Sequence, residues 1–301
     1  MYFGIKAHTE YKMNAHTSSL TASSNCFKRT NTSAEYHADK DILSSSMLKN
    51  ALISPAHYIS SLLEPHTDTP DKAFGTLIHA MVLEPQTVST LIAVYAGNSK
   101  DRKDWTAFKA ANSGRYCLTH AALIQAQLMS DMARSAMFRG RPFYKYVEEG
   151  EVEPSIHYAD PTTGISCRTR PDLLHPDFTF DLKTTRHSLP SQFQKDGVSM
   201  HYDLSAYMYT LSRVLIENTP TPKPFVLVPV DSNPPHGTHF MPCSAAFLEN
   251  GMKKYNTALS TIKACSLLDH WPTLDGEIEM DLMPWQVFIP PQATWRSSTP
   301  V

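Results

Sequence analysis

The sequence has almost no net charge and no long apolar run, and both absences exclude classes of protein. Its 301 residues carry 27 Lys and Arg against 29 Asp and Glu, a formal net charge of −2. No global basic field attracts nucleic acid, so a polyanion site must be a local basic patch. The apolar runs are far shorter than the roughly 20 residues of a membrane-spanning helix. The N-terminal stretch MYFGIKAHTEYK lacks the apolar core of a signal peptide, so we expect a cytoplasmic protein without membrane contact.

Cysteine is scarce, and its pattern argues against a zinc knuckle or an iron–sulfur cluster. The five cysteines are an odd number, widely scattered, and no two form a C-x-x-C pair. This pattern fits free thiols in a reducing cytoplasm. A cysteine hydrolase built on Cys167 is disfavoured, because that side chain is expected to face the core, where cysteine acts as a small hydrophobe. The full set is Cys26, Cys117, Cys167, Cys243 and Cys265.

Glycine is also scarce, with 11 residues against 22 prolines, so many junctions between elements should be marked by proline. The sequence shows no internal repeat. Residues 1–35 are rich in Ser, Thr, Asn and His and have little periodicity, which predicts a flexible arm. We place one domain at residues 36–289 and an irregular tail at residues 290–301.

Hydrophobic periodicity predicts helices, then a central sheet, then helices again. This order indicates an α/β (α+β) fold with one core. Helices are expected at 44–52, 54–63, 72–84, 105–111, 119–137, 191–196, 202–216 and 245–265. Strands are expected at 151–158, as a pair within 164–185, and at 225–230 and 239–241.

The pair of strands within residues 164–185, GISCRTRPDLLHPDFTFDLKTT, carries the chemistry. Side chains alternate along a strand, so Asp181 and Lys183 share one face with Thr179. Phe180 and Leu182 share the other face, which is apolar enough to pack on a core. An acid and an amine thus project together from an otherwise hydrophobic strand.

Two aspartates are expected to converge beside that lysine. Pairing of the two strands across the turn at 174–177 brings Asp172 close to Asp181. Carboxylate oxygens suit Mg²⁺ or Mn²⁺, which keep several waters and bind phosphate oxygens. Such an ion polarises a phosphoryl group and generates hydroxide. A neighbouring lysine holds or deprotonates the attacking water.

A bare D-x-K has a simpler explanation, a surface salt bridge that contributes little to stability. The longer string is stronger: R-P-D, a gap of eight residues, then D-L-K between two strands. Arg170-Pro171-Asp172 and Asp181–Thr185 resemble the PD-(D/E)-x-K nuclease signature. More narrowly, the chain resembles the exodeoxyribonuclease VIII (RecE-type) nuclease domain. Upstream support comes from residues 36–49, 54–58 and 74–85, and the resemblance covers roughly residues 36–209.

The resemblance implies a central mixed β-sheet flanked by helices and divalent-metal hydrolysis of DNA phosphodiesters. Its metal-binding set falls on His79, Asp172, Asp181 and Leu182, and its catalytic lysine on Lys183. His79 alone would be taken for a hydrogen-bonded core histidine. The G-T-x-x-H-A pattern of the family overrides that interpretation. A catalytic glutamate matches Glu153, with Glu148, Glu149 and Glu151 as close competitors.

One departure from the family concerns DNA handling. Related nucleases have Gln four residues before a Tyr in the helix after the lysine strand, whereas this chain has Ser205 before Tyr209. A shorter side chain there loses or replaces a substrate contact. We expect DNA contacts from Arg168, Arg170, Arg186, Ser205 and Tyr209, with the basic cluster at 139–145 as a further candidate.

The leading hypothesis is a Mg²⁺-dependent exonuclease of phage or prophage recombination, with Mn²⁺ as a substitute ion. The resemblance implies digestion of linear duplex DNA from 5′ ends, a RecT-type single-strand annealing partner and a homo-oligomeric ring. One alternative is a non-catalytic DNA-binding or assembly module with the nuclease fold. Another is a restriction-type endonuclease, which would cut closed circular DNA.

Overall fold

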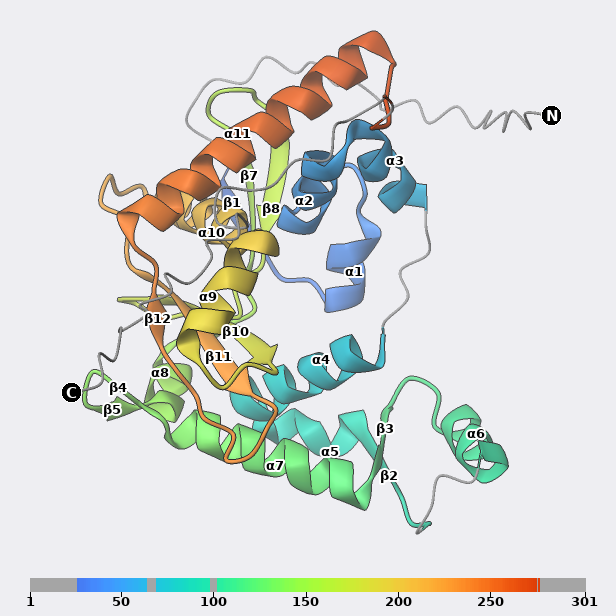
Figure 1. Cartoon of the computed structure of the whole chain (residues 1–301). Helices are drawn as coiled ribbons and strands as arrows, with labels where there is room; N and C mark the ends of the chain where they lie inside the picture. Colours follow the sequence, from blue (N-terminus) through green and yellow to red (C-terminus); the bar gives the residue numbers. More distant parts are fainter. Residues whose placement is uncertain (1–25, 64–68, 98–101, 275, 277–301) are drawn as a thin grey trace, which may run out of the picture.

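The computed structural model describes residues 26–63, 69–97, 102–274 and 276. Its main sheet has five strands in the order β12-β11-β10-β9-β6 (Figure 1). The two long strands, β10 (Thr179–Thr185) and β11 (Phe225–Asp231), are parallel, with Asp181 opposite Leu227. The short strands β6 (Glu151–Val152), β9 (Leu173–Leu174) and β12 (Met241–Pro242) pair antiparallel to their neighbours. The expected central mixed sheet is therefore present.

A second sheet of three antiparallel strands has the order β1-β7-β8, formed by β1 (Phe27–Arg29), β7 (Ser155–Ala159) and β8 (Ser166–Thr169). The two strands predicted within 164–185 are thus not one simple hairpin. β8 pairs with β7, and β9 pairs with β10 in the main sheet. Pro171 lies at the change of sheet, and a proline lacks the N–H that would continue the ladder.

The strand predicted at 151–158 is divided in the same way. β6 belongs to the main sheet and β7 to the small one. Between them Glu153 has a left-handed φ of 46°, and Pro154 follows it. A left-handed residue followed by a residue without an N–H ends one strand and redirects the chain into the next.

Order begins earlier than the predicted boundary at Tyr36. β1 pairs with β7, and Thr32 caps α1 (Ser33–Ala38) through a capping box with Glu35. The prediction of an arm reaching residue 35 is therefore wrong from Phe27 onward, because strand pairing and capping fix this polar segment. The rest of the predicted arm and the tail at 290–301 lie outside the described residues.

Seven helices that pack against the sheets or against one another carry most of the remaining described chain. They are α2 (Ser45–Ile53), α3 (Pro55–Leu63), α4 (Pro70–Leu83), α7 (His120–Ser135), α9 (Pro190–Ser199), α10 (Tyr202–Glu217) and α11 (Ala245–Leu268). Thr119 caps α7 as expected, accepting from the Ala122 N–H at 3.2 Å. No helix in the described part of the chain is long and apolar enough to cross a bilayer.

The remaining elements lie mainly at the edges. They are η1 (Pro85–Thr87), α5 (Val88–Leu91), β2 (Ile92–Tyr95), α6 (Arg102–Ala111), β3 (Tyr116–Thr119), β4 (Met137–Phe138), β5 (Arg141–Pro142) and α8 (Phe143–Glu149). β2 and β3 form a parallel pair, and α6 stands away from the main sheet (Figure 1).

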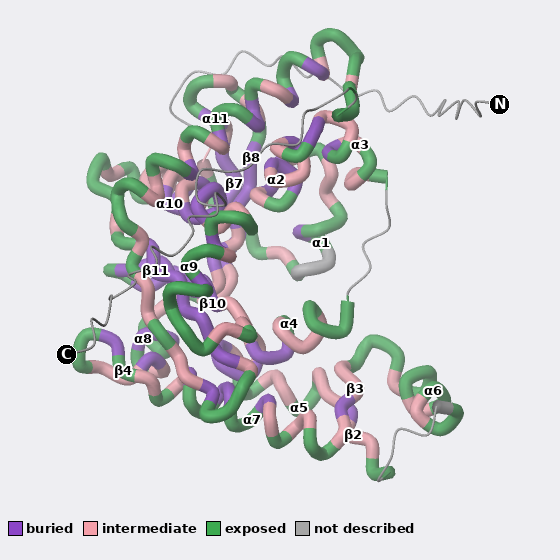
Figure 2. The backbone as a smooth tube through the Cα atoms, viewed as in Figure 1, coloured by how far each residue is buried: buried purple, intermediate pink, exposed green. Residues whose placement is uncertain are grey.

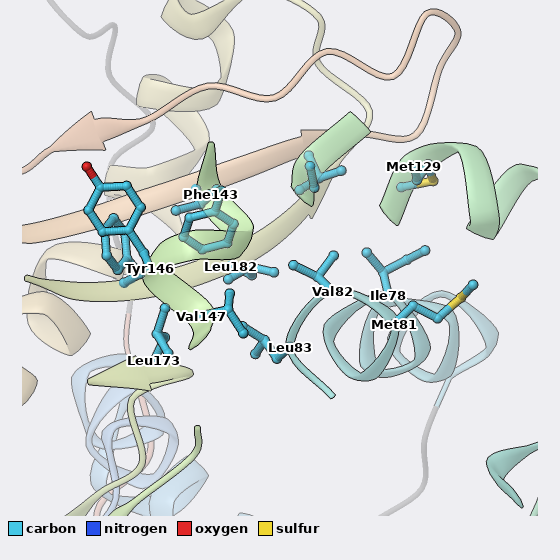
Figure 3. Close-up of a cluster of buried hydrophobic side chains, with 14 of the residues drawn as sticks. Ile78, Met81, Val82, Leu83, Met129, Phe143, Tyr146, Val147, Leu173 and Leu182 are labelled. Carbon is cyan, nitrogen blue, oxygen red and sulfur yellow. The ribbon is translucent and has the colours of Figure 1, made fainter. Parts of the chain in front are cut away.

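Helices cover both faces of the main sheet. On one face, α4 and α7 pack against β10 and β11 through Ile78, Met129, Leu182 and other buried side chains (Figure 3). On the other face, α9 and α10 pack against β11 through Phe193, Ala206, Phe225 and Leu227. Burial is accordingly concentrated on the two central strands (Figure 2).

A second hydrophobic cluster lies beside the small sheet. It joins α2, α3, α10 and α11 to β7 and β8, through residues that include Leu48, Tyr58, Leu204, Met208 and Tyr255. α11, drawn in red, crosses this end of the molecule (Figure 1). α10 contributes to this cluster and also covers the main sheet, so it connects the two packing units.

Candidate active site

Asp172 and Asp181 meet where β9 pairs with β10. Phe180 lies opposite Leu173 in the ladder, so the next residues outward are Asp181 and Asp172. The Leu182 N–H donates to Asp172 Oδ2 at 2.6 Å. The predicted convergence of the two aspartates is therefore present, and it is produced by the pairing of β9 with β10 within the main sheet.

His79 reaches the same point from α4. Its Nδ1 lies 3.5 Å from Asp172 Oδ1, and its side chain is 21% exposed. The flanking Leu77 and Ile78 are fully buried in the core, so His79 occupies the edge of the buried face of the helix. Gly75 allows α4 to come this close, because a Cβ at that position would stand 3.2 Å from Thr184 Oγ1.

Lys183 completes the cluster. Its ammonium group forms an ion pair with the Asp181 carboxylate and donates to the Leu182 carbonyl at 3.0 Å. The Lys183 side chain is 24% exposed, whereas that of Asp181 is only 5% exposed. The lysine thus lies at the open side of a cluster whose acids are enclosed.

The two aspartates differ in their ionisation. Burial opposes the charged form of both. For Asp172, the charge and hydrogen bond of His79, then Lys183 and the Leu182 N–H, outweigh burial and hold the pKa below its usual range. For Asp181, burial and the neighbouring Asp172 charge outweigh Lys183, and the pKa is raised.

The carboxylates raise the pKa values of the two basic groups, His79 and Lys183. Burial opposes the imidazolium of His79, but Asp172 raises its pKa above the usual value. Burial likewise opposes the ammonium of Lys183, but Asp181 and Asp172 raise its pKa. At neutral pH the Lys183 side chain is therefore a hydrogen-bond donor and a positive charge.

The donor atoms of this cluster suit a hard divalent cation. Among the described residues, no three His, Cys, Asp or Glu side chains form a ready-made metal group. However, the Lys183 ammonium contacts both the Asp181 carboxylate and the Leu182 carbonyl, so positive charge is already accommodated between these oxygens. Buried Asp181 Oδ2 has no aligned hydrogen-bond donor. Oxygen donors with one imidazole fit Mg²⁺ or Mn²⁺.

Glu153 lies outside this cluster. Its Oε2 accepts from Arg170 Nε at 3.0 Å and lies 2.9 Å from Arg170 Nη2. Only its main chain joins the site, because the Glu153 N–H donates to the Asp172 carbonyl at 3.1 Å. Arg170, which was predicted to contact DNA, is therefore already paired with Glu153. The competing Glu148, Glu149 and Glu151 form ion pairs with the basic side chains Lys145, Arg141 and Lys28.

The predicted DNA-binding arginines have different surroundings. Arg168 is buried, with its guanidinium 4.6 Å from the ring centre of Tyr36 and 3.7 Å from Asp39. Arg186 is exposed and pairs with Asp71 at 2.5 Å. Of the basic residues at 139–145, Arg139 lies between β4 and β5, Arg141 on β5 and Lys145 on α8. Arg141 and Lys145 pair with glutamates of α8. Of the arginines predicted to contact phosphate, Arg186 is therefore the most accessible.

Ser205 and Tyr209 lie on α10, which packs over the site. Ser205 is 7% exposed. Burial raises the pKa of Tyr209 well above its usual value, and the charges of Asp181 and Asp172 add to this effect. Tyr209 is therefore close enough to Asp181 and Asp172 to feel their charges.

Two further residues of the site were not predicted from the sequence. The Tyr202 ring centre lies 5.6 Å from Lys183 Nζ and 5.3 Å from Lys49 Nζ of α2. Tyr202 precedes Tyr209 by seven residues, so their shared helical face was a usable signal. Lys49 gave none, because a single lysine on an amphipathic helix is usually solvated.

A cavity of about 600 Å³ opens beyond the end of β10. Thr184, Thr185 and Arg186 follow Lys183 into its wall, and Phe74, Phe193 and Tyr202 supply aromatic surface. Tyr202 belongs to this wall and also lies beside Lys183, so the cavity adjoins the cluster.

Comparison with known proteins agrees with this geometry. The family model described as a PDDEXK-like domain of unknown function (DUF3799) matches residues 44–281. The curated proteins give no match. A crystal structure of a candidate exonuclease from Eubacterium rectale aligns with a TM-score of 0.53 at 14% identity, covering 85% of this chain and 97% of that one. At that identity the similarity shows the fold alone.

A second solved structure, that of SSO0001, aligns with a TM-score of 0.28 at 13% identity, covering 73% of this chain and 85% of that one. That similarity is too low to support an argument. The family match, by contrast, spans most of the chain and includes His79, Asp172, Asp181 and Lys183. The chain belongs to the PDDEXK-like family DUF3799, within the PD-(D/E)xK nuclease superfamily.

Proposed function

We propose that this protein is a Mg²⁺-dependent exodeoxyribonuclease that hydrolyses linear double-stranded DNA from its 5′ ends. The observation that carries the proposal is the cluster of His79, Asp172, Asp181 and Lys183 at the junction of α4, β9 and β10. It combines enclosed carboxylates with a lysine at the open side. Family membership supports the nuclease chemistry, and the resemblance to RecE-type domains supports the choice of DNA ends.

Each residue of the cluster has a distinct task. His79, Asp172, Asp181 and the Leu182 carbonyl would hold the ion, which polarises the phosphoryl group and supplies a nucleophile at neutral pH. Asp172 is fixed for this by the Leu182 N–H. Lys183, an ammonium at neutral pH, donates hydrogen bonds to the attacking water and to a phosphate oxygen, and offsets the negative charge that develops there.

The surroundings offer room for a DNA end. The cavity beside Tyr202 has aromatic walls, on which bases stack favourably. Arg186 at its rim is exposed and can exchange Asp71 for a phosphate. From the resemblance we further propose a homo-oligomeric ring and a RecT-type annealing partner for the 3′ single strands. The five free thiols support a reducing compartment, which we take to be the cytoplasm.

The test is digestion of linear duplex DNA labelled at either the 5′ or the 3′ end, with Mg²⁺ or with EDTA. Wild type should release 5′ label only with Mg²⁺ and leave covalently closed circles intact. Asp181→Ala and Lys183→Ala should lower the rate by about 10²- to 10⁴-fold, the range for removal of a group that acts in the transition state. Asp177→Ala and Lys263→Ala are matched controls on exposed residues and should digest as wild type does.

Two outcomes would change the proposal. A wild type that binds DNA but degrades none favours a non-catalytic DNA-binding module. Cutting of closed circles favours a restriction-type endonuclease with the same chemistry.

A Glu153→Gln variant in the same assay decides whether that glutamate acts on the ion. Because Glu153 is paired with Arg170, we expect the digestion rate to fall by less than about tenfold. Loss of a group that acts in the transition state would lower the rate at least 10²-fold.

A further inference from the structure

Lys49 is a cation at the site that has no ion-pair partner among the described residues. It lies on α2, and its ammonium group is directed over the ring of Tyr202, with Lys183 near the same ring. Within the described ranges, no carboxylate forms an ion pair with Lys49 and no acceptor receives a hydrogen bond from it. A largely enclosed ammonium with neither is rare, because its desolvation is not offset.

The acids around Lys49 are already occupied. Asp181 pairs with Lys183. Asp203 pairs with Lys254 at 2.8 Å and also accepts from Asn250 and the Leu204 N–H. Neither carboxylate is left to neutralise a second lysine. Lys49 therefore has no carboxylate of its own among the described residues.

The ionisation of Lys49 agrees with this geometry. Burial, and after it the charge of Lys183, lower the pKa of Lys49 to about 8 against the opposing pull of Asp181 and Asp203. A bound anion would offset both the desolvation of Lys49 and its repulsion by Lys183. The Tyr202 ring, which both ammonium groups approach, favours both cations electrostatically.

We propose that Lys49 binds a phosphate of the cleaved strand, next to the phosphate that Lys183 faces. The identification of this ligand as a DNA phosphate rests on the proposed function, because only that function brings a polyanion to this cluster. Lys49 is then a binding residue that positions the strand, and its contact is made equally before and during the reaction. Losing it should weaken binding while the chemical step continues.

The experiment measures DNA binding without catalysis. A fluorescent linear duplex is titrated in EDTA at salt concentrations from about 50 to 200 mM, the range over which phosphate contacts change affinity strongly. Wild type is compared with Lys49→Met, Lys49→Arg and Lys263→Met, the last an exposed lysine on α11. We expect Lys49→Met to raise Kd by about tenfold and to reduce the salt slope by about 0.9 for a duplex contact or 0.7 for a single strand.

The controls separate a phosphate contact from a structural role. Lys49→Arg keeps a positive charge and should retain most of the slope, while Lys263→Met should match wild type. Lys49→Met should melt no earlier than wild type. Its KM for DNA should rise with kcat within about threefold, as for loss of uniform binding.

The inference fails if Lys49→Met binds DNA with the wild-type Kd and salt slope, even when wild type proves to be a nuclease. It also fails if kcat falls about 10²-fold at unchanged KM, because Lys49 would then act on the reacting phosphate itself. Weaker binding by Lys49→Met upholds it even if wild type digests no DNA. A wild type that binds no DNA overturns it together with the proposed function.

Discussion

Single residues of this site differ more in their environment than in their chemistry. Asp172, directly before β9, and Asp181, on the neighbouring β10, are the same residue type, yet the pKa of Asp172 is lowered and that of Asp181 is raised. The difference comes from their partners. Asp172 accepts from a main-chain N–H and lies against His79, whereas Asp181 is more enclosed and feels the charge of Asp172. Such a separation of the pKa values of two neighbouring carboxyl groups is typical of catalytic sites.

Lys49 should make the stability of the protein depend on pH in a defined direction. Its pKa is about 8 in the folded chain against 10.5 for an ordinary lysine. Between these values the unfolded chain binds a proton that the folded chain does not, so the stability contributed at this position rises with pH. Lys183, Asp181, Asp203 and Lys254 are the charges that set this pKa.

Lys49→Met should therefore be more stable than wild type at pH 7, by about 2–4 °C for each kcal/mol regained. This advantage should shrink as pH rises above about 8 and vanish toward 10.5. Thermal melts in EDTA across this range measure it, with Lys263→Met as the control whose difference from wild type should not follow pH. A wild type that is the more stable protein at pH 7 contradicts the expectation.

At the scale of elements, the crossing of α10 and α11 depends on one glycine. A Cβ at Gly251 would lie 2.0 Å from the Asp203 carbonyl oxygen and 2.5 Å from its carbon. The helices therefore approach too closely at this point for any side chain. The same crossing places Lys254 against Asp203, one residue after Tyr202. The position of α10 over the candidate site thus depends on this contact.

Gly251→Ala should destabilise the protein by about 1–3 kcal/mol, the usual cost of forcing extra volume into a packed interface. It should do so although alanine is the better helix former. Denaturant unfolding measures the change. Gly237→Ala is the matched control, because no heavy atom lies within 4 Å of its added Cβ, and it should change stability by less than about 0.5 kcal/mol. Equal stabilities for the two variants would show that the helices can separate freely.

At the scale of the molecule, the site lies between two hydrophobic clusters. His79 and Lys183 come from elements of the cluster around α4, α7 and the main sheet. Lys49 comes from the cluster around α2, α3, α10 and α11. α10 packs against both the main sheet and the second cluster. The geometry of the site therefore requires both clusters to be intact together.

Fully buried Leu48 and Leu77 lie in the two different clusters, and replacing them tests this dependence. Leu48→Ala and Leu77→Ala should each cost about 2–5 kcal/mol, the range for a buried leucine. Each should lower the midpoint of one common unfolding transition, seen identically by far-UV circular dichroism and by tryptophan fluorescence. In the double variant the losses should add to within about 0.5 kcal/mol. Two separated transitions would show that the clusters fold independently.

Much of this protein was predictable from local sequence. The helices at α2, α3, α4, α7, α10 and α11 and the strands β10 and β11 agree with the predicted ranges to within a few residues. Periodicity, proline and capping residues are local signals, so they can be recognised without knowledge of the fold. The convergence of Asp172 and Asp181 was also predictable, because alternation along paired strands follows from covalent geometry.

Tertiary structure decided what depends on partners far away in the chain. The division of residues 151–158 and 164–185 between two sheets required knowing which strands pair. The burial of Arg168 and the pairing of Glu153 with Arg170 depend on neighbours that alternation does not reveal. Lys49 joined the site only because α2 packs beside α10. The sequence determined which side chains this protein can use, and long-range packing decided which of them meet, because burial and charge act through space.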